Sequence, residues 1–182
     1  MGITPSQTIG PFFDVLTRNR FIRTIAPDGV KGTRIKLVCR VFDGENTPVN
    51  DAMVEIWQAD ADGKYVENAG AEGGFRGWGR LGTDAQGACE FETILPGRVA
   101  GPDERLQAPH LNVTVFARGL LKHLFTRIYF EDDPANSEDS VLGLVPKERR
   151  QTLLAQRNGS DANTWRFDIH LQGPEETVLF DV

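Results

Sequence analysis

Cysteine is scarce in this sequence, and its two cysteines carry neither a metal-binding nor a disulfide pattern. Cys39 and Cys89 lie far apart and show no CxxC spacing, so the sequence suggests neither a common zinc motif nor a disulfide framework. Cys39 alternates with apolar neighbours, which favours a buried thiol. This cysteine usage fits a reducing cytoplasm.

Long apolar runs and an excess of basic residues are also absent. No segment approaches the roughly 18 apolar residues of a membrane-spanning helix, and the first 15 residues lack a basic leader followed by an apolar stretch. We therefore expect a cytoplasmic protein with no membrane partner. The 26 acidic side chains outnumber the 20 basic ones and give a net charge of −6, which argues against a nucleic-acid-binding surface.

A chain of 182 residues lies within the range of one domain and can bury a substantial core. Residues 1–33 contain Pro5, Pro11 and Pro27 but no long periodic segment, which predicts an irregular N-terminal arm that packs on a partner. We expect residues 34–182 to form a single domain.

Alternation of apolar and polar residues dominates this second region. Residues 34–42 alternate with the period of a strand, and further strand candidates follow at 52–58, 89–95, 110–117, 123–130 and 164–171. Residues 176–182 could add another strand. One helix is predicted at 145–157, with Pro146 at its first position. Short strands separated by turns, with a single short helix, predict an all-β fold of the antiparallel β-sandwich type.

The strand candidate within "QAPHLNVTVFARG" is unusual because polar groups interrupt an apolar segment. His110 and Asn112 are two residues apart, which places both on one face of the strand. From the residues alone, Arg118 fits a solvated arginine at the strand end. The same reasoning favours a solvated strand face for His170 and a strand edge for His123.

Six blocks stand out along the sequence: "TPSQTIGPFF", "VEIWQADADGKY", "LPG", "APHLNVTVFARG", "TRIYFEDD" and "RFDIHLQGPEETVLFDV". Together and in this order they resemble one known family, the intradiol ring-cleavage dioxygenases. Within it, the resemblance is to the α subunits of the two-chain members that cleave protocatechuate (3,4-dihydroxybenzoate). The resemblance implies a β-sandwich fold. In the family, two tyrosines and two histidines hold a non-haem ferric ion, and phenolate oxygen is a hard donor suited to Fe(III).

The resemblance also indicates where this chain departs from a complete iron site. The family's catalytic chains carry a His-x-His pair, which corresponds here to His110 and Asn112, and an arginine three residues earlier, which corresponds to Gln107. The first tyrosine matches Tyr65, whereas the second falls at Val99. Tyr65, His110, Asn112 and Val99 are thus expected to be vestigial ligand positions, with no metal and no catalytic residue on this chain. The resemblance implies that a homologous β subunit binds the Fe(III).

The same resemblance suggests how this chain supports the reaction. The αβ pairs would assemble into a higher oligomer that converts protocatechuate and O2 to 3-carboxy-cis,cis-muconate. Thr8, Gly10 and Pro11 of the arm would line the active site of the β subunit, and Arg118 would attract the substrate carboxylate.

Two other interpretations stay open at the level of sequence. One is a single-chain dioxygenase with rearranged ligands, for instance Tyr65, His110, His123 and Tyr129. The other is a non-enzymatic β-sandwich module for binding or assembly. We nevertheless expect Tyr65 and His110 to form a hydrogen-bonded pair in a vestigial pocket rather than to bind iron.

Overall fold

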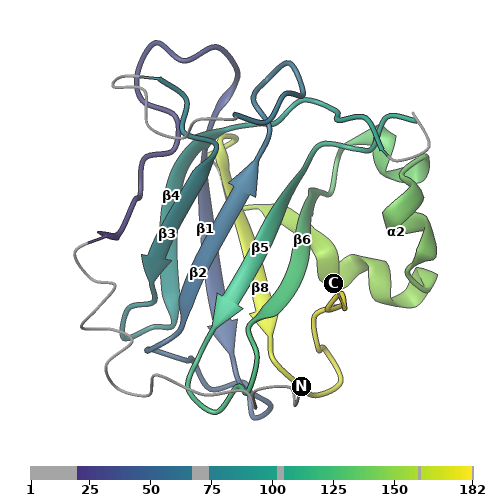
Figure 1. The fold of residues 1–182 in the computed structure, drawn as a ribbon. Coiled ribbons are helices and arrows are strands. Elements are labelled where there is room, and N and C mark those ends of the chain that lie inside the picture. The colour runs from purple at the N-terminus through teal and green to yellow at the C-terminus, as the bar shows by residue number, and fades with distance from the viewer. Residues whose placement is uncertain (1–19, 67–73, 102–104, 160, 182) are drawn as a thin grey trace, which may run out of the picture.

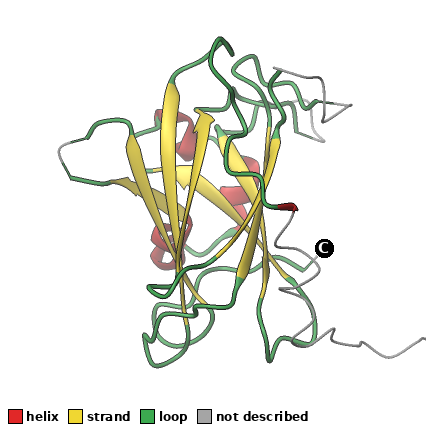
Figure 2. Ribbon diagram, turned by 90° about the vertical axis from the view of Figure 1, so that its left-hand side faces the viewer, coloured by secondary structure: helices red, strands yellow, loops and turns green. Residues whose placement is uncertain are grey.

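The computed structural model describes residues 20–66, 74–101, 105–159 and 161–181. Strands in two layers dominate this part of the chain (Figures 1 and 2). In chain order the strands are β1 (Arg34–Phe42), β2 (Met53–Gln58), β3 (Trp78–Gly82), β4 (Ala88–Ile94), β5 (His110–Phe116), β6 (Leu124–Phe130), β7 (Leu154–Arg157) and β8 (Thr164–His170).

Hydrogen bonds connect these strands in the order β3-β2-β5-β6-β7-β8-β1-β4. The short strand β7 pairs with β6 on one side and with β8 on the other, so it joins the two layers. The predicted β-sandwich is therefore confirmed, and most neighbours are antiparallel. Two pairs, β1 with β8 and β6 with β7, run parallel. Apolar alternation could not predict this, because it reports which face is buried and not which way a strand runs.

The core lies between the layers and is built from every second residue of the strands. In β1 the inward positions Leu37, Cys39 and Val41 are fully buried, and in β8 Trp165 and Phe167 meet them from the neighbouring strand. Burying a side chain of this size stabilises the fold by about 1.5–3 kcal/mol. Cys39 is thus a buried thiol, as expected, and its register partner Cys89 is also free.

The predicted helix at 145–157 is wrong over its second part. Only Lys147–Leu153 is helical, as the 3-10 helix η3, and the chain then enters β7 at Leu154. Leu153 is buried in a small second cluster, and Leu154 pairs with Tyr129 of β6, so sheet pairing outweighs the helical preference of this segment. Two short helices precede η3: η2 (Pro134–Ser137) and α2 (Ser140–Leu144).

Both ends of the described chain lie on the sandwich. Ile22 bridges to Arg80, Thr24 bridges to Glu92, and Ile25 is fully buried in the core. The remaining arm positions Thr8, Gly10 and Pro11 lie outside the described residues. Within residues 176–181 the predicted last strand is reduced to a single bridge between Phe180 and Phe125. Across the described ranges, no helix is both long and apolar enough to cross a membrane.

Two glycines bring the loops that follow β2 and β4 into backbone contact. Gly63 has φ +78°, and a Cβ added there would lie 1.9 Å from the carbonyl oxygen of Arg98. A Cβ at Gly97 would lie 2.5 Å from the backbone nitrogen of Gly63. The "DGKY" and "LPG" blocks therefore need glycine so that the Tyr65 loop can reach the Val99 loop.

Because of this contact, we expect the stability of the fold to depend on glycine at position 63. We expect Gly63→Ala to lower the free energy of unfolding by about 2 kcal/mol, because it adds both a positive-φ penalty and a backbone clash. Gly143→Ala in α2 is the matched control, since a Cβ there meets nothing within 4 Å and Gly143 is not among the positive-φ residues. Urea unfolding followed by circular dichroism measures both, and equal stabilities would contradict the close approach.

Candidate pocket and vestigial metal positions

His110 and Asn112 lie on the face of β5 that points away from the core, which explains why a largely apolar strand carries them. Residues 111, 113 and 115 are buried toward the core, so the even-numbered positions project from the opposite face. Register places Asn112 between Trp57 of β2 and Arg127 of β6, and it pairs His110 with Tyr129. Paired residues share one face, so these side chains gather on the outer surface of one layer.

A pocket of about 700 Å³ lies over this surface. Its walls come from β2, β3, β5 and β6, together with the two loops that the glycines bring into contact. All four vestigial ligand positions line it. The described lining residues are Glu55, Trp57, Tyr65, Trp78, Val99, Ala100, Gln107, His110, Asn112, Thr114, Phe125 and Arg127.

Tyr65 enters the pocket from the loop after β2. Asn112 Nδ2 donates a hydrogen bond of 3.0 Å to the Tyr65 hydroxyl, and the Tyr65 ring lies 4.6 Å from the Trp57 ring. Burial raises the pKa of Tyr65 above its usual value, so its neutral phenol is favoured. The expected hydrogen-bonded pair of Tyr65 and His110 is wrong, because Tyr65 bonds to Asn112 and His110 bonds elsewhere.

His110 is the first residue of β5 and only 3% of it is exposed. Its Nδ1 lies 2.8 Å from the carbonyl oxygen of Ala108, which fixes Nδ1 as the protonated nitrogen of the neutral ring. Nε2 is then left as an acceptor. Burial, with a smaller contribution from the nearby Arg127 charge, lowers the pKa of His110 from 6.5 to about 4.

The depressed pKa of His110 predicts loss of stability in mild acid. The unfolded chain binds a proton near pH 6.5 and the folded chain only near pH 4, so stability is complete above 6.5 and falls as the pH drops through this window. The loss is at most roughly 1.4 kcal/mol per pH unit.

Urea titrations at pH 7 and pH 5 test this expectation. His110→Gln should flatten the difference between the two curves, whereas His123→Gln should keep it, because His123 is exposed just before β6. A pH dependence that survives His110→Gln unchanged would assign it to another group.

Arg127 is a pocket-lining residue that the sequence did not lead us to expect. Its Nη1 donates to Gln107 Oε1 at 2.7 Å and to the Tyr129 hydroxyl at 3.3 Å. Gln107, which the resemblance matches to an arginine of the family's catalytic chains, thus accepts from Arg127 in the pocket. The alternation of Phe125, Arg127 and Tyr129 along β6 was the pattern that could have predicted this placement.

A buried carboxylate supports the back of the pocket. Asp139, the N-cap of α2, is 3% exposed and accepts hydrogen bonds from four groups. Two come from the first turn of α2, from the backbone of Val141 and Leu142 at 3.0 and 2.7 Å. The others are the Ala108 backbone N–H at 2.7 Å and the Tyr129 hydroxyl at 3.1 Å. Asp139 therefore fastens the segment that carries His110 to α2.

The donor set in the pocket does not fit the family's ferric ion. Among the described lining residues, only Tyr65 and His110 are matching donors, since Asn112 directs its amide nitrogen at Tyr65 and Val99 presents methyl groups. In the described ranges, no three His, Cys, Asp or Glu side chains converge as a metal site. The rearranged ligand set also fails to converge, because Tyr129 donates to Asp139 and the His123 ring lies against Phe116 and Phe125.

Arg118 lies outside this pocket. It follows β5, eight residues beyond His110, which is about 26 Å along an extended strand. Its side chain is 80% exposed and its Nε lies 2.9 Å from Asp51 Oδ2. The guanidinium is thus exposed to solvent beyond the end of β5 that lies farthest from His110.

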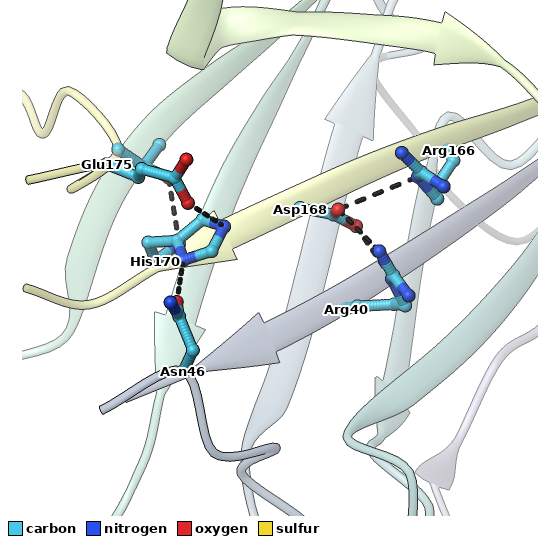
Figure 3. A network of polar contacts seen from close by, with 7 residues as sticks. Arg40, Asn46, Arg166, Asp168, His170 and Glu175 are labelled. Carbon is cyan, nitrogen blue, oxygen red and sulfur yellow. Dashed lines mark hydrogen bonds and ion pairs between the residues drawn. The ribbon is translucent and has the colours of Figure 1, made fainter. Parts of the chain in front are cut away.

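A second polar cluster occupies the outer face of β1 and β8 (Figure 3). Asp168 accepts from Arg40 Nε at 2.7 Å and lies 3.6 Å from Arg166 Nε. His170 stacks on Phe42 and its Nδ1 lies 3.1 Å from Asn46 Oδ1. His170 thus lies on the outer face of β8, as its alternation indicated, but its side chain is only 16% exposed rather than fully solvated. Its Nε2 lies 3.9 Å from Glu175 Oε2.

Comparison with known proteins gives the family. A family model described as Dioxygenase matches residues 10–173. The protocatechuate 3,4-dioxygenase alpha chains of Burkholderia cepacia and Pseudomonas putida are 45% and 41% identical, each over 98% of this chain and over 97% and 96% of their own lengths. The corresponding beta chain of B. cepacia is 32% identical over 96% of this chain and 77% of its own.

Solved structures agree with this relationship. The dioxygenase domain of a dioxygenase carbohydrate-binding protein fusion from Streptomyces sp. SirexAA-E aligns with a TM-score of 0.67 and 26% identity, covering 94% of this chain and 99% of that domain. The chain therefore belongs to the intradiol ring-cleavage dioxygenase family, where it is similar over nearly its full length to protocatechuate 3,4-dioxygenase alpha chains.

Proposed function

We propose that this chain is the non-iron-binding α subunit of a two-chain ferric dioxygenase that cleaves protocatechuate with O2 to 3-carboxy-cis,cis-muconate. The observation that carries the proposal is the incomplete donor set, in which Asn112 and Val99 occupy two of four ligand positions. A homologous β subunit supplies the Fe(III), and αβ pairs form the higher oligomer. The similarity to both alpha and beta chains supports this arrangement.

In this arrangement the present chain acts from outside the iron centre. Arg118, exposed at the end of β5, faces the β subunit's active site and draws in the substrate carboxylate. Thr8, Gly10 and Pro11 reach the same site from the arm. The ferric ion, when bound by the β subunit, activates the catechol ring for attack by O2.

Iron content and turnover test the proposal together. The chain is expressed alone and with a β subunit that carries two tyrosines and the His-x-His strand, in medium supplied with iron. We expect the solitary chain to contain no stoichiometric iron and to leave protocatechuate intact, whereas the pair copurifies with iron and consumes O2. A solitary chain that shows a tyrosinate-to-iron absorption band and cleaves protocatechuate would refute it.

A further inference from the structure

The pocket over β5 contains a cation whose described contacts are all neutral. Arg127 donates to Gln107 and Tyr129, and no carboxylate in the described chain forms an ion pair with it. By contrast, Arg40, Arg80 and Arg157 each contact an aspartate or glutamate. The buried Asp139 carboxylate reaches Arg127 only through the Tyr129 hydroxyl, and it already accepts from three backbone N–H groups. A partly buried guanidinium with no directly bonded carboxylate favours an anion, since charge-assisted hydrogen bonds are about twice as strong as neutral ones.

The acidic residue among the described lining residues, Glu55, does not form an ion pair with Arg127. Glu55 also lines the pocket, but its Oε1 accepts from Arg80 Nε at 2.5 Å, and Arg80 in turn lies over the Trp78 ring. The Glu55 charge is thus compensated within β2 and β3. Among the described lining residues, Arg127 is therefore the charge without a directly bonded partner of opposite sign, and it is positive whereas the whole chain carries a net charge of −6.

The walls of the pocket fit a flat ring. Trp57, Tyr65, Trp78 and Phe125 all line it, and Trp57 is 48% exposed although it is a large aromatic residue. The ring of Trp57 lies against that of Tyr65, which leaves an aromatic surface open to the pocket. Aromatic rings on such walls gain offset or edge-to-face contacts of about 0.5–1.5 kcal/mol beyond burial.

Polar groups of fixed direction accompany the arginine. The Tyr65 hydroxyl already accepts from Asn112, so its own proton is available to a ligand. His110 points its Nδ1 at Ala108, so Nε2 is an acceptor for a ligand hydroxyl. The pocket therefore offers a cation, a phenol donor and an imidazole acceptor beside aromatic walls.

From these contacts we infer that the pocket of this chain binds a small aromatic carboxylate without a metal ion, with the carboxylate on Arg127 and the ring against Trp57. The inference concerns ligand binding by this chain alone. It rests on the proposed function only in that no ferric ion occupies this pocket. Binding is therefore measured in the presence of a chelator.

Calorimetric titration of the full chain with 4-hydroxybenzoate in EDTA tests the inference. This probe keeps the ring, the hydroxyl and the carboxylate but is not a catechol. We expect saturable binding, and a loss of about tenfold or more for 4-hydroxybenzamide, in which the charge is removed. Arg127→Gln should lose about tenfold or more of the affinity for 4-hydroxybenzoate and none for the amide.

Two further variants keep the test decisive. Trp57→Ala alters a half-exposed residue, so it is expected to fold, and it should weaken binding of both the acid and the amide. Arg23→Gln, an exposed arginine paired with Glu90 away from the pocket, should leave affinity unchanged. Equal affinities for acid and amide, wild-type affinity in Arg127→Gln, or binding that appears only with added Fe(III) would each overturn the inference. Because turnover is not measured, failure here is distinct from failure of the two-chain proposal.

Discussion

Asp139→Ala is expected to lower the free energy of unfolding by about 4 kcal/mol, which is a large effect for a single substitution. The carboxylate is 3% exposed and accepts from four donors at 2.7–3.1 Å. Removing it leaves the N–H groups of Ala108 and Leu142 buried without an acceptor. Urea unfolding at pH 7 followed by circular dichroism measures the change.

Asp133→Ala provides the matched control. Asp133 is also an N-cap aspartate, at the start of η2, but its side chain accepts only from Ala135 N, at 2.9 Å. Removing the Asp133 carboxylate should lower the free energy of unfolding by about 1 kcal/mol. If the two variants were equally stable, the joint attachment of α2 and the His110 segment by Asp139 would be refuted. Asp139→Ala should also weaken 4-hydroxybenzoate binding, because Ala108 orients His110 at the pocket.

Arg118→Ala is expected to reduce kcat/KM for protocatechuate by about 10- to 100-fold in the assembled αβ enzyme, with the iron content unchanged. The reason is loss of one charge-assisted contact to the substrate carboxylate, which is worth about 1.5–3 kcal/mol when shielded from water. Steady-state O2 consumption and metal analysis of the same preparation provide both readouts.

Two controls separate the guanidinium from its ion pair. Asp51→Ala removes the same ion pair with Arg118 but leaves the arginine in place, so it should preserve turnover. Catechol, which lacks the carboxylate, should be cleaved by Arg118→Ala at the wild-type rate. Unchanged kinetics with protocatechuate would remove Arg118 from the proposed role, and an equal loss with catechol would assign it to assembly instead.

The sandwich could be predicted from sequence because its strands alternate cleanly. The six firm strand segments lie within one or two residues of β1, β2, β4, β5, β6 and β8. Strand β3 was missed because "WGRLG" carries two glycines, which weaken a strand pattern. Strand β7 was missed because it is only four residues long and continues an apparently helical segment.

The pocket was predictable only in part. The spacing of His110 and Asn112 correctly placed both on one face of β5, where the structure brings them beside Tyr65 and Val99. Arg127 was missed because the alternation along β6 gives the face that it shares with Phe125 and Tyr129 but not the register that sets it opposite Asn112. Asp139 was missed because two of its donors, Ala108 and Tyr129, lie 31 and 10 positions away in the sequence, and only the others come from its own helix.

The alternation of β5 has a consequence for how such a chain can diverge. Its odd-numbered residues 111, 113 and 115 lie in the core between the layers, and its even-numbered residues His110, Asn112 and Thr114 line the pocket. Exchanging a metal ligand for an amide at position 112 therefore spares the interior packing. A duplicated gene can in this way abandon one chemistry while its product keeps the shape needed to recognise a sibling subunit, which leaves the discarded cavity open to acquire a new ligand.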